Sequence, residues 1–275
     1  MSIILDGKAL ATSIRGDLAE TVREYGLKPC LAIVTVGDDP ASAVYVRNKK
    51  KACEQIGIEC RHIRFPEDTT EYMVLSTVRN LCNDTDVHGV IVQLPLPKHI
   101  NPVNVTNLIW RSKDVDGFGH DSLFAPCTPE GVIRLLDHHL INIDGANAVV
   151  LGRSNIVGKP LAQMLLDRNA TVSICHSHTS FEQRNDLTRN ADIICCAVGE
   201  PGLITPEDIK PGVVLVDVAI NRDIEGKLCG DVNPTCYPYA YAYTPVPGGI
   251  GPMTVAMLME HVVQSAIWQK ESINA

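Results

Sequence analysis

Six short apolar runs, rich in β-branched residues, alternate with longer helix-like segments along this chain. The apolar runs are residues 31–37, 88–95, 147–152, 171–176, 192–198 and 213–220, and the predicted helices are 7–25, 42–56, 70–82, 128–139, 158–168 and 254–270. Nearly continuous apolar strands are typical of parallel sheets that are buried on both faces. Their alternation with helices predicts an α/β fold.

The irregular segments predict two domains, which the length of 275 residues allows. Residues 110–127 have no sustained periodicity, and residues 245–252 hold too many prolines and glycines for the interior of an element. We therefore expect a first domain of residues 1–117, to which a final helix within 254–275 returns. A second domain would cover residues 118–253, with a cleft between the two domains.

Charge and targeting signals limit the partners. The formal net charge is −8, which argues against nucleic acid because phosphate binding needs a basic surface. The segment MSIILDGKAL lacks the basic region of a signal peptide, and no apolar stretch approaches the roughly 20 residues that span a membrane. We expect neither a nucleic-acid nor a membrane partner.

The ten cysteines include no C-x-x-C pair, so the usual zinc and thioredoxin patterns are absent. Several lie in apolar runs, such as Cys195 and Cys196, where a free cysteine acts as a small apolar side chain. The reduced environment of the cytoplasm is the expected compartment.

The segment 147–166 combines a strand, a glycine turn and a helix. Gly152 starts the turn and Gly158 opens the helix, so that backbone amides can face a pyrophosphate. The match to G-x-G-x-x-G is imperfect, since Ser154 occupies the third position. The alternative is that the two glycines only end a strand and permit close packing.

The residues around this turn favour NADP over NAD. The strand that follows ends in His176-Ser177-His178-Thr179, without the acid that usually holds a ribose 2′-hydroxyl, and Arg153 comes directly after Gly152. A cation and a hydroxyl suit a 2′-phosphate, although an exposed arginine and a polar loop would look the same. The two histidines lack a third ligand at suitable spacing, so we expect no metal site.

Candidate catalytic residues lie in the first domain. Tyr45 and Lys49 are four residues apart and share one helix face, whereas Lys50 and Lys51 point about 100° and 200° further round. Gln93 ends an apolar run, and the carboxyl ends of strands are where α/β sheets bind ligands. Asp116 provides a carboxylate at the predicted domain junction.

Each of these candidates has a plainer interpretation. The lysines can form a solvated basic run, and the glutamine can cap its strand. The segment Lys113–Gly117 can be a simple Asp-Gly turn; as a calcium loop it lacks the remaining ligands.

Eight segments together resemble one enzyme family. In chain order they are DDPASAVYVRNKKKAC, VIVQLPLP, KDVDGF, PCTPEGV, GRSNIVGKP, DVAIN, GDV and PVPGGIGPMTV. This order is that of the bifunctional methylenetetrahydrofolate dehydrogenase/methenyltetrahydrofolate cyclohydrolases, and the resemblance extends from about Leu5 to the last helix. It implies NADP-dependent oxidation of 5,10-methylenetetrahydrofolate to the 5,10-methenyl compound, followed by hydrolysis to 10-formyltetrahydrofolate.

The resemblance also implies roles for single residues. Lys49 would be the central catalytic group, Tyr45 would lie against the folate rings, Gln93 would tune the lysine and Asp116 would hold the pterin. Residues implied to contact the cofactor are Gly152, Arg153, Ser154, Ser177 and Ile220, and the turn Pro247-Gly248-Gly249 would border the folate. The first domain would then bind folate, the second would be a Rossmann-like NADP domain, and the protein would be a homodimer paired through it.

The chain departs from the family pattern at three places. Only GHDSLFA separates Phe118 from Pro126, where a longer segment is usual, so the resemblance does not imply the folate or interdomain contacts that the longer segment makes. Ala219 replaces a usual glycine near the nicotinamide half of the cofactor, and Ile250 replaces a usual valine.

Two other functions compete with this interpretation. A dehydrogenase without the hydrolysis step would not need the set of Lys49, Gln93 and Asp116. A non-catalytic NADP-binding sensor would not need Lys49 or the Gly248-Gly249 turn.

Overall fold

The computed structural model describes residues 2–274, which form two compact units. Unit 1 consists of the described residues up to Ala11 and of Thr128–Thr254; unit 2 consists of Thr12–Cys127 and the described residues from Val255 on. Helices α1 (Gly7–Glu24), α5 (Cys127–His138) and α8 (Ile250–Asn274) each contribute residues to both units.

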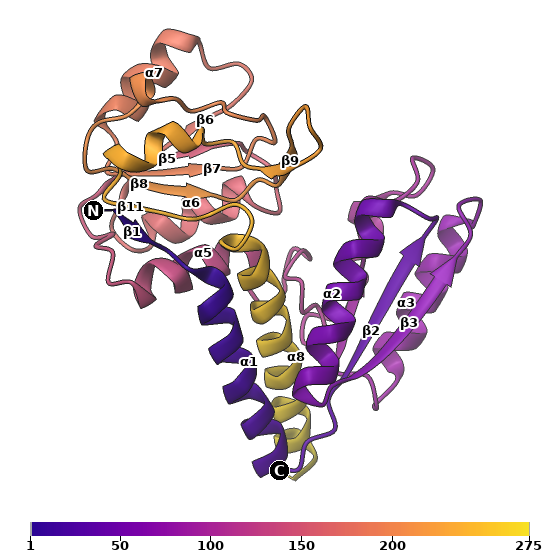
Figure 1. Ribbon diagram of the computed structural model, residues 1–275. Coiled ribbons are helices and arrows are strands. Elements are labelled where there is room, and N and C mark those ends of the chain that lie inside the picture. Colours follow the sequence, from indigo (N-terminus) through magenta and orange to yellow (C-terminus); the bar gives the residue numbers. More distant parts are fainter. Residues whose placement is uncertain (1, 275) are drawn as a thin grey trace. The chain divides into compact units, whose positions relative to one another are not determined.

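Unit 1 contains a six-stranded parallel sheet in the order β1-β11-β8-β7-β5-β6 (Figure 1). Its strands are β1 (Ile3–Ile4), β5 (Asn147–Leu151), β6 (Thr171–Cys175), β7 (Ile193–Cys196), β8 (Val214–Asp217) and β11 (Ala242–Tyr243). A separate antiparallel pair is formed by β9 (Asn221–Arg222) and β10 (Leu228–Cys229).

Both faces of this sheet are buried, as the continuous apolar runs predict. Ala148 and Val150 of β5 pack into one apolar cluster with α5 and α6 (Gly158–Leu166), while Val149 and Leu151 pack into a second cluster. The second cluster includes residues next to α7 (Phe181–Asn190) and the 3₁₀ helices η1 (Pro206–Asp208) and η2 (Pro234–Tyr239). Helices on both faces explain why successive residues are apolar.

Unit 2 contains a three-stranded parallel sheet in the order β3-β2-β4, formed by β3 (Glu59–Phe65), β2 (Cys30–Val36) and β4 (Gly89–Val92). Helices α2 (Pro40–Ile56) and α3 (Glu71–Asn83) cover its opposite faces (Figure 1), and the short α4 (Pro102–Thr106) follows β4. The buried side chains of α3 and of the sheet face beneath it form one cluster, which includes Ala32, Val34, Val74, Val78, Cys82, Val90 and Val92.

The ends of α2 follow from its sequence. Asp39 accepts a hydrogen bond from the Ser42 amide at 2.7 Å, and Pro40 occupies the first turn, where a missing N–H costs nothing. Gly57 ends the helix with a φ of 88°, in the left-handed region. These signals fix the start and the stop of the helix that carries Tyr45 and Lys49.

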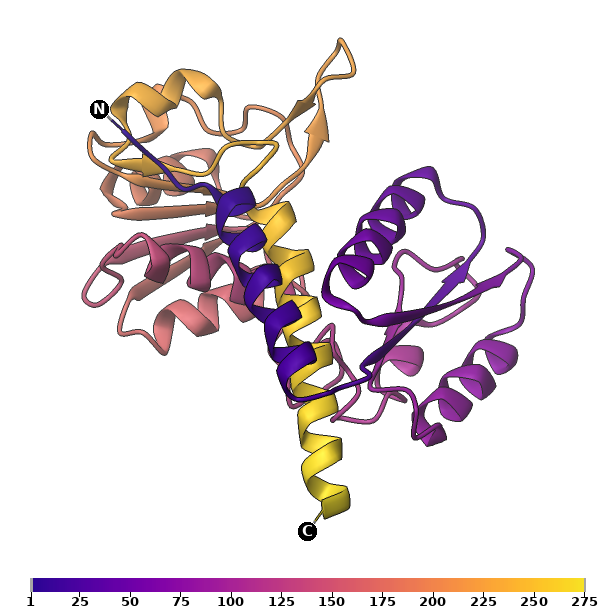
Figure 2. The ribbon, with the colours of Figure 1, turned by 60° about the horizontal axis from the view of Figure 1, so that its bottom comes forward.

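Helix α8 begins earlier than its predicted start at residue 254. Residues 250–252, which we expected outside any element, form its first turn. Pro252 is tolerated there because the first amides of a helix have no intrahelical acceptor. Helices α1 and α8 lie side by side (Figure 2), and a Cβ on Gly7 would lie 2.0 Å from the Gly249 oxygen.

The six predicted helices and six predicted strands are all present, and the α/β fold with a parallel sheet is confirmed. The elements that the sequence patterns did not indicate are β1, β3, β9, β10, β11, α4, α7 and the 3₁₀ helices. None of the described helices combines the length and apolar character that a bilayer crossing demands.

Candidate functional sites in the two units

Lys49 differs from the lysines beside it. Its side chain is buried, with only 7% of the residue exposed, whereas Lys50 is half-buried and Lys51 is exposed. The Lys49 Nζ donates to the Gln93 Oε1 at 3.2 Å and lies 3.9 Å from the Asp116 Oδ1. A buried ammonium is stable only with such partners, so this lysine is not part of a solvated basic run.

Gln93 follows β4 directly, and its backbone amide extends the strand pairing by donating to the Val34 carbonyl at 2.9 Å. Its side-chain Nε2 donates to the Leu94 carbonyl at 2.9 Å. Because the amide nitrogen is used in this way, the amide oxygen is left facing Lys49.

Asp116 lies in a tightly held loop and is 9% exposed. The carbonyl of Val115 accepts hydrogen bonds from the Cys127 thiol at 3.2 Å and lies 2.8 Å from the His261 Nδ1. Gly117 has a φ of 72°, and a Cβ there would lie 2.4 Å from the backbone of Ala125. No other residue fits this position without strain, so the turn after Asp116 depends on glycine here.

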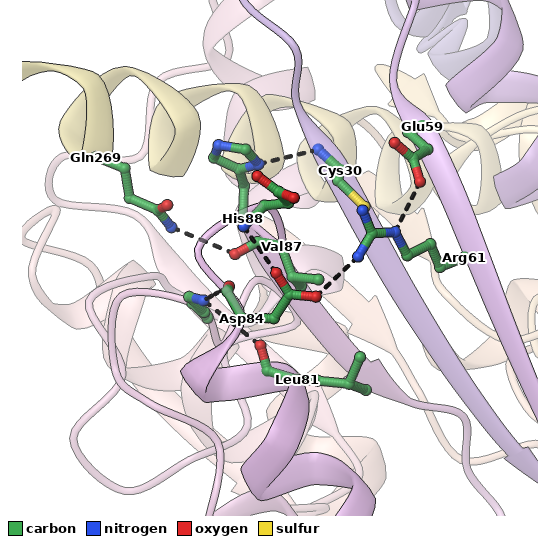
Figure 3. Close-up of polar contacts among 10 residues, drawn as sticks. Cys30, Glu59, Arg61, Leu81, Asp84, Val87, His88 and Gln269 are labelled. Carbon is green, nitrogen blue, oxygen red and sulfur yellow. Dashed lines mark hydrogen bonds and ion pairs between the residues drawn. The ribbon is translucent and has the colours of Figure 1, made fainter.

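Lys113 anchors the start of the same loop. Its Nζ donates to the Asp84 carbonyl at 2.6 Å and to the Leu81 carbonyl at 3.5 Å, and burial lowers the pKa of its amine. The Asp84 carboxylate in turn binds Arg61, which also binds Glu59 (Figure 3). This polar network ties the loop to the end of α3 and to β3, and so fixes where Asp116 can lie.

Tyr45 lies one turn before Lys49 on α2 and is 40% exposed. A pocket of about 450 Å³ opens at the carboxyl edge of the three-stranded sheet, where it is lined by residues 36–39, 66–67 and 95–97. The segment that carries Gln93 therefore leads directly into a hollow edge of the sheet, the position where α/β sheets bind ligands.

The glycine turn of unit 1 is built by two close backbone approaches. Gly152 has a φ of 111°, and a Cβ there would lie 2.5 Å from the Ala197 oxygen. A Cβ on Gly158 would lie 2.2 Å from the Gly152 oxygen. Both positions exclude a side chain, and the turn leads into α6 as a phosphate-binding turn requires.

The other predicted cofactor residues surround this turn. Arg153 and Ser177 are both exposed. Leu151 at the end of β5 lies opposite Cys175 at the end of β6. Arg153 and Ser177 each follow two residues later, so both lie at the same edge of the sheet. The Ser154 Oγ accepts from the amides of Val157 at 3.1 Å and of Gly158 at 3.3 Å, so it caps the turn internally.

Ile220 follows β8 at the same carboxyl edge and is 43% exposed. The turn of Pro247, Gly248 and Gly249 precedes α8. Gly248 has a φ of 114°, and a Cβ on Gly249 would lie 2.8 Å from the Pro245 oxygen. Both glycines are therefore needed for the backbone path.

Two buried carboxylates of unit 1 were not among the predicted site residues. Asp217 is 2% exposed and Asp231 is fully buried. Burial raises the pKa of Asp217 to about 6, although amides of Val232 and Asp231 donate to it and oppose the shift. A charged residue inside the apolar run 213–220 is the signal that could have identified Asp217.

All ten cysteines are free thiols. Among residues 2–274, no group of three or more His, Cys, Asp and Glu side chains is arranged to hold a metal ion.

Two family models match the chain in tandem. Residues 5–116 match the catalytic domain of tetrahydrofolate dehydrogenase/cyclohydrolase, and residues 126–270 match its NAD(P)-binding domain. The chain belongs to the tetrahydrofolate dehydrogenase/cyclohydrolase family. Lys49, Gln93 and Asp116 lie in the part that matches the family's catalytic domain, and the Gly152 turn lies in the part that matches its NAD(P)-binding domain.

Relatives in this family are similar over nearly the whole chain. The bifunctional protein FolD of Agathobacter rectalis is 48% identical over 278 residues, covering 96% of this chain and 99% of the relative. The crystal structure of FolD from Campylobacter jejuni has a TM-score of 0.94 at 44% identity and covers 97% of this chain and 99% of its own.

A second family structure contains a cofactor. The methylenetetrahydrofolate dehydrogenase-cyclohydrolase of Trypanosoma brucei, complexed with NADP and an inhibitor, has a TM-score of 0.92 at 34% identity. It covers 100% of this chain and 99% of its own.

Proposed function

We propose that this protein oxidises 5,10-methylenetetrahydrofolate to 5,10-methenyltetrahydrofolate with NADP and then hydrolyses the product to 10-formyltetrahydrofolate. The observation that carries this proposal is the buried contact of Lys49 with Gln93 and Asp116, in a chain that belongs to the dehydrogenase/cyclohydrolase family. Family membership supplies the substrate class, and the lysine cluster supplies the group that the hydrolysis needs.

The residues of unit 1 fit a dinucleotide. Gly152 and Gly158 leave room for a phosphate group against the start of α6, and Arg153 with Ser177 provides a cation and a hydroxyl for a 2′-phosphate. When it is bound there, NADP supplies the hydride acceptor of the oxidation. We assign Gly152, Arg153, Ser154, Ser177 and Ile220 to this site.

The oxidation asks little of the protein's acids and bases. One hydride leaves the methylene carbon, and the remaining cation is delocalised over the two neighbouring nitrogens. The protein's task is to hold the folate in one orientation. We assign that task to Tyr45 and Asp116, and substrate contacts to Pro247, Gly248 and Gly249.

The hydrolysis requires proton transfer. Water adds to the methenyl carbon and loses a proton, after which one carbon–nitrogen bond breaks and that nitrogen gains a proton. The Lys49 amine is placed for these transfers, because Gln93 and Asp116 both face it and the lysine is buried. Gln93 orients the amine through a neutral acceptor and adds no charge.

We also propose a homodimer in a reducing, cytoplasmic compartment. The dimer rests on the family resemblance, and the compartment is supported by the ten free cysteines. Sedimentation velocity of the purified protein tests the dimer: one species at twice the chain mass is expected, and a monomer across micromolar concentrations would refute it.

The activity is tested by mixing the protein with 5,10-methylenetetrahydrofolate and NADP. We expect absorbance of NADPH and of the methenyl compound to rise, and the methenyl absorbance then to fall as 10-formyltetrahydrofolate forms. Persistent methenyl absorbance would indicate a dehydrogenase without the hydrolysis step. Binding of NADP without turnover would indicate a sensor.

A further inference from the structure

The carboxylate of Asp231 is fully buried and accepts hydrogen bonds from four groups. Its oxygens accept from the backbone amides of Val198 at 2.8 Å, Gly199 at 3.1 Å and Glu200 at 2.8 Å, and from the Asn221 side chain at 2.9 Å. A carboxyl group is tolerated in such a position only when hydrogen bonds replace its lost hydration.

These donors come from two neighbouring strand ends. Residues 197–200 follow β7, and Asn221 comes four residues after the end of β8. The Ala197 amide donates to the Leu151 carbonyl at 2.9 Å, and its oxygen is the atom that excludes a side chain at Gly152. Asp231 therefore holds the loop that lies directly against the nucleotide turn.

The sheet topology assigns this loop to one half of the cofactor. From β5 the chain moves to β6 on one side and then to β7 on the other side, and dinucleotides bind across such a switch point. Arg153 and Ser177 occupy the β5–β6 side, where they suit the 2′-phosphate. The ends of β7 and β8 remain for the nicotinamide half.

We infer that Asp231 is a positioning residue for the nicotinamide half of NADP, because its carboxylate fixes residues 198–200 and Asn221 at the edge where that half binds. The inference rests on the proposed function. It assigns to Asp231 no contact with the cofactor or the folate.

Asp217 holds Asp231 in place. Its carboxylate accepts from the backbone amides of Asp231 at 3.1 Å and Val232 at 2.8 Å. A Cβ on Gly230 would lie 1.9 Å from the Asp217 Oδ2, so only glycine fits there. Two carboxylates thus explain the Gly-Asp-Val segment at 230–232. Asp217 orders the backbone of this segment, and Asp231 in turn orders residues 198–200.

The test is Asp231→Asn in the full-length protein. Asparagine keeps the shape but offers one acceptor oxygen and a donor in place of two acceptor oxygens. We expect the dehydrogenase kcat/KM to fall by about 10²-fold, the scale of a misplaced reactant, and the Kd of NADPH to rise. The Kd of 2′-phospho-ADP-ribose, which lacks the nicotinamide, and hydrolysis of methenyltetrahydrofolate without NADP should both stay at wild-type values.

The control is Asp208→Asn, which changes another buried carboxylate of unit 1, one that accepts hydrogen bonds from the amide and the hydroxyl of Thr205. It should leave both dissociation constants unchanged. If Asp231→Asn does not fold by circular dichroism, Asn221→Ala removes one donor and should weaken NADPH but not the fragment.

Equal loss of affinity for NADPH and the fragment would overturn the inference, as would a parallel loss of hydrolysis or wild-type behaviour of the variants. A wild-type protein that neither binds NADPH nor hydrolyses methenyltetrahydrofolate would instead refute the proposed function.

Discussion

Lys49 is the side chain on which the proposed hydrolysis depends. In Lys49→Met the apolar stem remains and the amine is lost, so we expect the fold to survive. Hydrolysis of methenyltetrahydrofolate should fall by about 10²–10⁴-fold, the usual effect of removing a general acid–base group, and any residual oxidation should stop at the methenyl product. The measurement is the decay of methenyl absorbance, corrected for spontaneous hydrolysis. The control is Lys51→Met, which changes an exposed lysine of the same helix and should leave hydrolysis at the wild-type rate. If Lys49→Met hydrolyses methenyltetrahydrofolate within a few-fold of the wild-type rate, Lys49 does not have the proposed role.

Arg153 is the residue on which the preference for NADP should rest. Arg153→Ala should weaken NADP by about 1.5–3 kcal/mol, as expected for a charged hydrogen-bond partner, and should leave the use of NAD little changed. Steady-state KM values for both cofactors check this. Arg168→Ala removes an arginine that pairs with Asp137 in the same unit and serves as the control. Equal kcat/KM of the wild type for NADP and NAD would contradict the assignment.

Asp217 should make the stability of the protein depend on pH. Burial raises its pKa from 3.8 to about 6, so folding favours the protonated carboxyl. Its contribution to stability is fully present below about pH 3.8 and is lost as the pH rises through 6, a loss of about 3 kcal/mol at 1.36 kcal/mol per unit. Asp231, which lies beside it, adds to the cost of the ionised form.

The measurement for Asp217 is urea unfolding of the wild type and of Asp217→Asn between pH 4 and pH 7.5. Other titrating groups act equally on both proteins, so they cancel in the difference. Relative to the variant, the wild type should lose stability as the pH rises. Parallel curves for the two proteins would show that Asp217 does not titrate in this window.

At the scale of elements, the junction of β5 with α6 leaves no room for a methyl group on Gly158. A Cβ on Gly158 would lie 2.2 Å from the Gly152 oxygen, so Gly158→Ala must displace the turn. We expect NADPH binding and oxidation to be lost and hydrolysis to remain, measured on the same preparation. Gly16→Ala is the matched control, because a Cβ there meets nothing within 4 Å, and it should stabilise α1 by about 0.5–1 kcal/mol. Oxidation at the wild-type rate by Gly158→Ala would show that the turn tolerates displacement.

Which elements could be predicted from the sequence depends on where their apolar residues lie. The central strands were predicted because both faces are buried. Strand β3, with the sequence ECRHIRF, was missed because it is an edge strand without a fully buried residue. Helix α7 was missed because its sequence FEQRNDLTRN presents few apolar side chains to the core. A recognisable sequence pattern needs buried apolar side chains, and edge strands and surface helices have few of them.

The same reasoning applies to the candidate site. Helical spacing placed Tyr45 and Lys49 on one face, but the approach of Gln93 and Asp116 to the Lys49 Nζ joins three separate segments of the chain. No local pattern encodes such a contact. The roles of these residues, and the assignment of residues 1–117 with 254–275 to folate and 118–253 to NADP, stay predictions.

At the scale of the whole molecule, cofactor binding should stabilise the fold. NADP binds only the folded chain, so NADP at a hundred times its Kd should add about 2.7 kcal/mol to the free energy of unfolding. Thermal unfolding with NADP should therefore occur at a higher Tm than with the same concentration of NAD. Arg153→Ala should abolish this difference; a Tm raised equally by NADP and NAD would contradict the preference.

The pairing of β1 with β11 constrains when the large sheet is completed during synthesis. Ile3 lies opposite Ala242, so β1, the first strand made, cannot pair until β11, the last strand of the described chain, has been made. On the ribosome, the segments 147–151, 171–175, 193–196 and 214–217 emerge in turn. Strand β8 stays an open edge until β11 pairs with it, and β1 then pairs with β11. Unpaired edges attract other chains. A nascent chain released before residue 242 would therefore lack two strands of its sheet, and would carry the exposed edge that native completion removes.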